Sequence, residues 1–171
     1  MDRNYDMKNP LEVVIAGGGI GGLTVAIALH RAGHKVQVVE KAPAMGWGQG
    51  VQVSPPAMAL LAELSVAEPV RAAGQVMRSA RKLTADGLVL RERAFGRVSG
   101  VDQPHVSISR GTLQLVLAEA VKALGIDILL DHGVQSFDER QGSVRATLPS
   151  ASDQAARCSG GRRPCSELSS N

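Results

Sequence analysis

The sequence predicts an α/β fold with a parallel sheet and additional short antiparallel strands, and three observations support this prediction. A short β-branched segment at residues 11–16 runs into a glycine-rich turn, and a helical pattern follows. A second β-branched segment occupies residues 35–40. Strands and helices then continue to alternate, as they do in α/β proteins. We therefore expect parallel strands joined by right-handed crossovers.

Composition narrows the functional classes. The chain has 171 residues, 44% hydrophobic and 20% charged, with a net charge of 19 − 16 = +3, which suits one globular domain. Four aromatic residues and scattered basic residues argue against nucleic-acid binding. The two cysteines, Cys158 and Cys165, provide neither a disulfide framework nor a four-ligand zinc site, and we expect a cytoplasmic protein. Five glycines interrupt the uncharged segment 13–30, so we expect no membrane span.

The first half of the chain contains a β-α-β unit. Its expected elements are strands at 11–16 and 35–40 around a helix at 20–32, a long loop at 42–56, and helical structure at 57–73. Gly33 can end the first helix by adopting a positive φ. Trp47 is expected to pack within the loop. The helical segment at 57–73 is either one helix or two short helices broken near Pro69.

The second half of the chain continues the alternation. Its expected elements are short antiparallel strands within 77–98, a strand at 106–109, a helix ending at Gly125, a strand at 126–130, and antiparallel strands at 133–137 and 143–148. Ser109 is expected to cap the helix. The apolar face of that helix is predicted to contain Leu113, Val116, Leu117, Ala120, Val121 and Leu124. We divide the chain into an N-terminal extension (1–10), a domain (11–148) and an unstructured polar tail (149–171).

The first turn carries the informative motif. Gly17, Gly19 and Gly22 satisfy G-x-G-x-x-G between a predicted strand and a predicted helix. Gly17 permits the tight turn, Gly19 lets the backbone approach a pyrophosphate, and Gly22 lets the helix pack closely on the strand. The phosphates would lie at the helix N-terminus, where backbone N–H groups and the helix dipole favour negative charge.

Glu40 strengthens this interpretation. It stands 40 − 22 = 18 residues after the last motif glycine, at the end of the second predicted strand. A carboxylate there can accept hydrogen bonds from the ribose hydroxyls of an adenosine. The sequence therefore predicts a Rossmann-like dinucleotide-binding domain. The motif alone does not separate NAD from FAD, and the alternative is a glycine-rich turn without a ligand.

Several further segments resemble the N-terminal part of group A flavin-dependent aromatic hydroxylases, which include the salicylate and para-hydroxybenzoate hydroxylases. The resembling segments are Gly17 to Leu23, Val39-Glu40-Lys41, Gly48 to Pro55, and Ser109-Arg110-Gly111-Thr112-Leu113. The resemblance covers roughly residues 11–148. It implies a glutathione-reductase-type FAD-binding domain, and an enzyme that hydroxylates a small aromatic substrate with NAD(P)H and O₂.

The resemblance also implies roles for individual residues. FAD would be bound at its pyrophosphate by Gly17, Gly19, Ile20 and Gly22, and at its adenosine ribose by Glu40 with Lys41 beside it. Arg110 would contact the flavin side, Val51 the ribityl or flavin part, and the backbone of Val134 the adenine. The alternative is that Arg110 and Lys41 are ordinary surface residues, and that Val51 and Val134 are ordinary strand residues. We find no candidate catalytic residue and no metal-ligand set, which suits chemistry carried by a cofactor.

The chain departs from the family in its length. Full members are more than twice as long and carry later Asp-Gly and Gly-Asp motifs, which are absent here, so we expect an incomplete domain of doubtful activity alone. Codons for residues 159–163, shifted by one nucleotide, can spell Leu-Val-Ala-Asp-Gly. This predicts that the tail arose by a frameshift between about residues 148 and 159. Two alternatives remain: an NAD-binding dehydrogenase domain and a non-catalytic dinucleotide-binding fragment.

Overall fold

The computed structural model describes residues 10–95, 103–140 and 143–148. The chain divides into two compact units: unit 1 comprises residues 1–45 and 121–171, and unit 2 comprises residues 46–120. The polar tail predicted at 149–171 and nearly all of the N-terminal extension lie outside the described residues. Within the described ranges, none of the helices combines the length and the apolar character that crossing a membrane requires.

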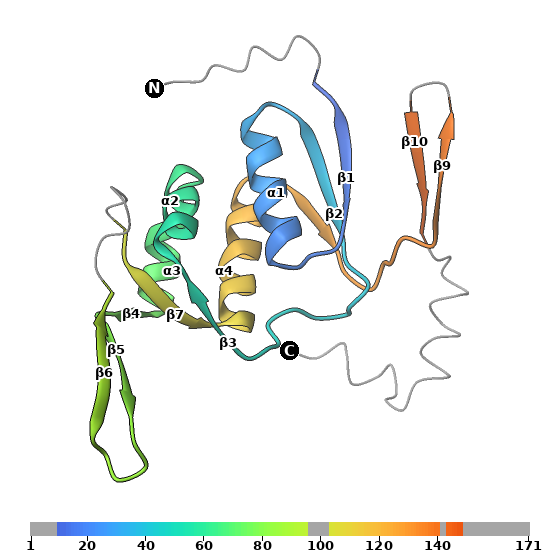
Figure 1. Ribbon diagram of the computed structural model, residues 1–171. Coiled ribbons are helices and arrows are strands. Elements are labelled where there is room, and N and C mark those ends of the chain that lie inside the picture. Colours follow the sequence, from blue (N-terminus) through green and yellow to red (C-terminus); the bar gives the residue numbers. More distant parts are fainter. Residues whose placement is uncertain (1–9, 96–102, 141–142, 149–171) are drawn as a thin grey trace, which may run out of the picture. The chain divides into compact units, whose positions relative to one another are not determined.

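Unit 1 is organised around a three-stranded parallel sheet in the order β1–β2–β8, with β1 at one end (Figure 1). The strands are β1 (Glu12–Ala16), β2 (Lys35–Val39) and β8 (Asp127–Leu129), and helix α1 (Ile20–Arg31) joins β1 to β2. The β-branched side chains of Val38 and Val39 are buried, as are Leu23 and Ile27 of α1. Burying these side chains drives the helix onto the sheet. The predicted β-α-β unit with parallel strands is confirmed.

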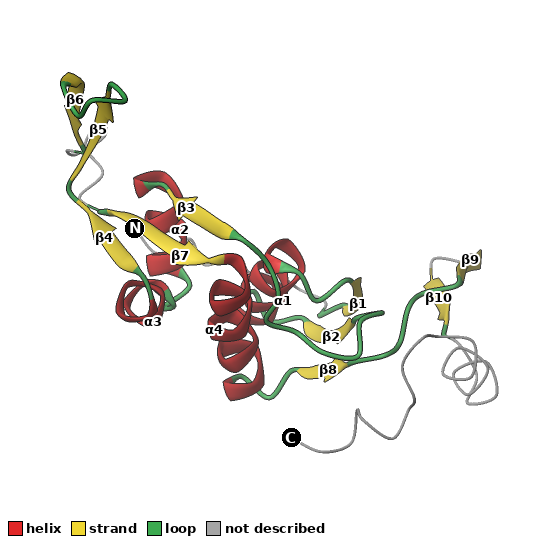
Figure 2. Cartoon of the chain, turned by 90° about the horizontal axis from the view of Figure 1, so that it is seen from below, coloured by secondary structure: helices red, strands yellow, loops and turns green. Residues whose placement is uncertain are grey.

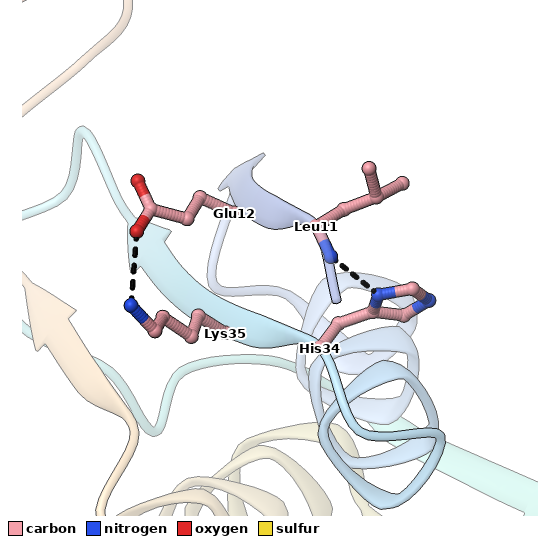
Figure 3. Close-up of polar contacts among 4 residues, drawn as sticks. All are labelled: Leu11, Glu12, His34 and Lys35. Atoms are coloured by element: carbon pink, nitrogen blue, oxygen red, sulfur yellow. Dashed lines mark hydrogen bonds and ion pairs between the residues drawn. The ribbon is translucent and has the colours of Figure 1, made fainter. Parts of the chain in front are cut away.

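Contacts at the start of β1 hold it against β2 (Figure 3). The backbone N–H of Leu11 donates to Nδ1 of the buried His34 side chain at 3.1 Å. Glu12 and Lys35 form an ion pair at 3.1 Å with both side chains more than three-quarters exposed. An exposed pair of this kind contributes at most about 1 kcal/mol. The backbone bond to His34 is therefore the more important anchor of this strand end.

Unit 1 also contains the hairpin of β9 (Ser136–Arg140) and β10 (Ser143–Thr147), which pair antiparallel as predicted. The predicted strand at 133–137 begins later than expected, at Ser136. The physical reason lies upstream, where backbone N–H groups of Asp131 and His132 donate to the carbonyl oxygens of Ala42 and Glu40. These bonds hold the chain against the end of β2, so it joins the hairpin only after this segment.

Unit 2 contains a three-stranded antiparallel sheet in the order β3–β7–β4 (Figure 2). Its strands and the two helices that precede β4 are β3 (Gly50–Val53), α2 (Pro55–Glu63), α3 (Ala67–Ala73), β4 (Gln75–Met77) and β7 (His105–Ser109). Met58, Leu61 and Val70 of the helices are buried together with Val106 and Ile108 of β7. These apolar side chains form the core of this unit.

Two sequence predictions for this region were wrong in their boundaries. The loop predicted at 42–56 is shorter, because β3 begins at Gly50 and α2 at Pro55. Proline fits the first turn of a helix, because the backbone N–H that it lacks would have no hydrogen-bond acceptor within the helix at that position. The same reason allows Pro69 to lie inside the first turn of α3. The break between the helices instead occurs around Ser65, whose φ is +57°.

The antiparallel strands predicted within 77–98 are confirmed as the hairpin of β5 (Ser79–Leu83) and β6 (Val89–Ala94). An ion pair between Arg81 and Glu92 at 3.0 Å links the two strands. All residues of both strands are exposed. The end of the predicted region, beyond Phe95, lies outside the described residues.

Helix α4 (Arg110–Ala123) runs from unit 2 into unit 1. The Ser109 hydroxyl oxygen accepts the N–H of Thr112 at 2.9 Å, which confirms the predicted cap. Leu113, Leu117 and Val121 of the predicted apolar face are fully or almost fully buried. Gly125 follows the helix with a φ of +75°, the left-handed conformation that glycine adopts most readily.

Candidate dinucleotide-binding site

The glycine turn between β1 and α1 depends on Gly17. Its φ of +118° is one that side chains disfavour, and its N–H donates to the carbonyl oxygen of Val39 at 2.7 Å. The turn is therefore tied directly to the end of β2, the strand that leads into Glu40. This bond brings two parts of the predicted site into one local structure.

Gly22 has no room for a side chain, whereas Gly19 faces open space. A Cβ at Gly22 would meet the carbonyl oxygen of Gly17 and lie 3.3 Å from Cγ2 of Ile15, so only glycine allows α1 to come this close to β1. A Cβ at Gly19 would have no neighbouring heavy atom within 4 Å. The space in front of Gly19 is therefore open to a ligand that needs close contact with the backbone.

The first turn of α1 offers backbone donors. At the start of this helix, the N–H of Leu23 donates to the carbonyl oxygen of Gly19 at 3.0 Å. The N–H groups of Ile20, Gly21 and Gly22 precede that bond, so they have no acceptor in the helix. Gly19, at the N-cap, has no side chain to accept them, and the first turn contains no acidic residue. The turn therefore fits an anion such as a pyrophosphate.

Glu40 faces the glycine turn. Its Oε2 accepts the N–H of Gly18 at 2.6 Å, and its Oε1 accepts the N–H of Ala42 at 2.8 Å. Its own N–H donates to the carbonyl oxygen of Leu129 in β8 at 2.8 Å. The carboxylate is thus held beside the pyrophosphate-binding turn by charge-assisted bonds. The structure brings Gly17, Gly19 and Glu40 together in unit 1, as the sequence predicts.

Lys41 and Val134 lie in the same unit. Lys41 is exposed, and its Cβ is 3.1 Å from the position that a Cβ of Gly133 would occupy. Val134 is half-buried in the segment between β8 and β9 and not in a strand. It lines a cavity of about 700 Å³ whose wall is largely β1 and the β9–β10 hairpin. None of the motif glycines nor Glu40 lines that cavity, so Val134 belongs to a neighbouring space.

Val51 and Arg110 belong to unit 2. Val51 lies half-buried in β3 and pairs with Ile108 of β7. Arg110 is the exposed first residue of α4, and its N–H donates to the carbonyl oxygen of Gln49 at 2.7 Å. These two residues are therefore neighbours through the β3–β7 ladder, although 59 residues separate them in the chain (110 − 51).

Sequence reasoning missed three residues that shape these sites. Gly18 supplies the N–H that orients Glu40, and its place inside the glycine run was the available signal. Gly111 has no room for a Cβ, which would meet the carbonyl oxygen of Gly46. Gln114 accepts the N–H of Gly46 at 3.1 Å through Oε1. Gly111 and Gln114 lie in the first two turns of α4, close to the predicted apolar face, and a glycine inside a helix could have indicated a close backbone contact.

A family model described as an FAD binding domain matches residues 10–159. The chain belongs to the group A flavin-dependent aromatic hydroxylase family. It is 38% identical over 138 residues to phenazine 1,6-dicarboxylic acid hydroxylase PhzS of Lysobacter antibioticus, covering 78% of this chain and 34% of that protein. It is 33% identical over 146 residues to 3-hydroxybenzoate 6-hydroxylase of Polaromonas naphthalenivorans, covering 81% and 36%.

The fold of a solved structure agrees. The crystal structure of CtdE in complex with FAD matches with a TM-score of 0.67 and 25% identity, over 82% of this chain and 35% of that one. The chain therefore spans about a third of the length of these relatives. The predicted FAD-binding fold and the choice of FAD as the cofactor are confirmed at the level of the family.

The residues present fit FAD. The open space before Gly19 and the free N–H groups of α1 suit its pyrophosphate, and Glu40 has the chemistry to accept ribose hydroxyls. The residues on which this fit rests all belong to unit 1.

Proposed function

We propose that unit 1 binds the ADP portion of FAD. Gly17, Gly19, Ile20 and Gly22 form the pyrophosphate site, in which backbone N–H groups of α1 donate to phosphate oxygens. The strongest support is that the space in front of the Gly19 backbone is open and that the Glu40 carboxylate accepts a hydrogen bond from Gly18 in the same turn.

Three residues are proposed to bind the adenosine. Glu40 accepts hydrogen bonds from the ribose hydroxyls, and Lys41, exposed next to it, adds positive charge near the phosphates. The backbone of Val134 contacts the adenine. The support for the last assignment is that Asp131 and His132, which shortly precede Val134, donate backbone hydrogen bonds to the carbonyl oxygens of Ala42 and Glu40.

Two residues of unit 2 are proposed to bind the other part of the cofactor. Arg110 contacts the flavin side, where a guanidinium can pair with oxygens or stack on a ring. Val51 contacts the ribityl or flavin part from β3. Both proposals rest on the positions of these residues in the family motifs and on their being neighbours across the β3–β7 ladder.

We further propose that the complete protein is a monooxygenase that hydroxylates a small aromatic substrate with NAD(P)H and O₂. The names of the relatives, which are hydroxylases of a phenazine dicarboxylic acid and of 3-hydroxybenzoate, support this. Bound FAD would supply the redox chemistry, with the nicotinamide as reductant and O₂ as oxidant. The role of this chain is to bind and orient the cofactor, and we assign it no catalytic residue.

A binding experiment tests the proposal. The purified chain is mixed with FAD, desalted, and examined for flavin absorbance near about 450 nm, with about one FAD per chain expected. NAD⁺, tested in parallel by calorimetry, should bind much more weakly. The variant Glu40→Gln should lose affinity, whereas Glu12→Gln, which changes an exposed carboxylate of the same unit, should not.

The alternatives give different results in the same experiment. Tight NAD⁺ binding without FAD binding would indicate a dehydrogenase domain and refute the FAD proposal. A colourless protein that binds neither nucleotide would indicate a non-binding fragment. FAD binding that Glu40→Gln leaves unchanged would refute the assigned role of Glu40 but keep the cofactor.

A further inference from the structure

The β5–β6 hairpin of unit 2 carries a group of exposed apolar side chains (Figure 1). Leu83, Leu88, Val89 and Leu90, at its turn and in the adjoining strand ends, are between 52% and 66% exposed. An exposed apolar residue that stands alone needs no explanation. Trp47 is such a residue, and the prediction that it packs within its loop was wrong, because its side chain is 74% exposed. Leu88, Val89 and Leu90 instead follow one another in the chain, and a run of exposed apolar residues indicates a contact surface.

One face of the hairpin carries basic side chains without acidic ones. Lys82 lies opposite Arg91, and Arg93 occupies the next position on the same face, opposite Ala80. Like charges placed directly opposite each other on neighbouring strands destabilise a hairpin, so folding does not account for them. In the described part of the chain, none of these three basic side chains forms an ion pair. They remain available to an anionic partner.

The acidic residues of the hairpin lie elsewhere. Glu92 forms its ion pair with Arg81 at 3.0 Å on the opposite face. Asp86 lies in the turn between the two strands. Four basic and two acidic residues give the segment 79–94 a net charge of 4 − 2 = +2. The hairpin therefore combines a positive charge with an apolar end.

This combination fits the surface of an anionic membrane, where apolar side chains enter the boundary of the acyl chains and basic side chains meet the lipid phosphates. We infer that the β5–β6 hairpin binds such a surface, with Leu88, Val89 and Leu90 in the membrane interface and Lys82 and Arg91 among the headgroups. A soluble acidic protein would pair with the basic residues but would leave the apolar run in water. The inference does not depend on the binding of FAD.

Flotation of the full chain with lipid vesicles tests the inference. Vesicles of phosphatidylcholine with about 30% phosphatidylserine should bind the chain, and pure phosphatidylcholine vesicles should bind it at least about tenfold more weakly. Binding to the anionic vesicles should weaken at about 1 M salt, because the Debye length falls to about 3 Å.

A double substitution tests the basic face. Arg91→Gln combined with Arg93→Gln should weaken binding to the anionic vesicles by about fivefold for each charge removed. The control combines Lys122→Gln with Arg145→Gln, which removes two exposed basic residues outside the hairpin. Both variants lose the same net charge, and the control should bind within about twofold of wild type.

Single substitutions test the apolar run and the turn. Leu90→Ser should weaken binding about tenfold. Leu60→Ser is the matched control, because Leu60 in α2 is 61% exposed and Leu90 is 60% exposed, and it should bind like wild type. Asp86→Asn should bind at least as tightly as wild type, since it removes a negative charge beside the lipid phosphates. All of these side chains are exposed, so each variant should keep the circular dichroism spectrum of wild type.

The inference is overturned if the wild-type chain does not float with the anionic vesicles, or floats equally with neutral ones. It is also overturned if either hairpin variant binds like its control, or if Asp86→Asn weakens binding. Retention of the chain on immobilised polyglutamate without vesicle binding would overturn it as well, and would indicate an acidic protein as the partner.

Discussion

The substitution Gly22→Ala separates helix propensity from packing, because its neighbour Gly21 provides a matched control. In α1, alanine stabilises relative to glycine by up to about 1 kcal/mol. At Gly22 the new methyl group meets the carbonyl oxygen of Gly17 and lies 3.3 Å from Cγ2 of Ile15. Backbone cannot rotate away as a flexible side chain can, so the steric penalty falls near the upper end of the 1–3 kcal/mol range, at about 3 kcal/mol. The net loss of unfolding free energy is about 2 kcal/mol.

Gly21→Ala adds the same methyl group one residue earlier, where no heavy atom lies within 4 Å. We expect it to keep or raise the unfolding free energy by up to about 1 kcal/mol. The two variants should therefore differ by about 3 kcal/mol in urea unfolding followed by circular dichroism, or by about 10 °C in Tm. Equal stabilities of the two variants would refute the close packing of α1 on the glycine turn.

Three other substitutions test the site and the charges. Gly19→Ala should leave the unfolding free energy within about 0.5 kcal/mol of wild type, because the φ of Gly19 is −74° and no heavy atom lies near the new methyl group. Calorimetry should nevertheless show FAD binding at least about tenfold weaker than wild type. Equal FAD affinity would argue against a pyrophosphate at this residue. Glu40→Gln should lower the unfolding free energy by about 1–3 kcal/mol, since the carboxylate accepts hydrogen bonds from two backbone N–H groups. The control Glu12→Gln should change the unfolding free energy by less than about 0.5 kcal/mol in the same urea denaturation. Equal losses in the two variants would contradict the role of the Glu40 carboxylate in holding the glycine turn. A hydrogen bond from the Thr84 side chain lowers the pKa of Asp86. The ionised carboxylate therefore adds stability above the pKa of the unfolded chain, and this stability is lost as the pH falls through the pKa of the folded protein. Thr84→Val should raise the pKa of Asp86 in a ¹³C NMR titration, and an unchanged pKa would contradict the assignment.

The β-α-β unit could be predicted because its signals are local. The β-branched runs, the glycine motif and Gly33 each determine the conformation of a few adjacent residues, and the structure places their elements within one or two residues of the prediction. The cap at Ser109 was found for the same reason. Residue identity alone was enough where only a short stretch of chain had to be considered.

The wrong predictions concern residues whose effect depends on distant neighbours or on exact position in a turn. Pro55 suggested a loop but begins α2, because proline is unfavourable only after the first helical turn. The exposure of Trp47 depends on Gly111 and Gln114, more than sixty residues later, holding its loop. The bond from Gly18 to Glu40 was not predicted for a similar reason, because it links residues 22 positions apart and no local pattern encodes it.

The position of β1 at the end of the parallel sheet divides its amide groups into two sets. The carbonyl oxygen of Leu11 accepts a hydrogen bond from the N–H of Lys35 in β2, and the N–H of Gly17 donates one to the carbonyl oxygen of Val39 in β2. The backbone N–H and C=O groups of the odd-numbered residues of β1 therefore face β2. The amides of Glu12, Val14 and Ala16 therefore point to the open side within the described part of the chain. Hydrogen exchange along β1 should alternate, slow at odd positions and fast at even ones. Loss of that alternation would reveal, residue by residue, any polypeptide added along this edge.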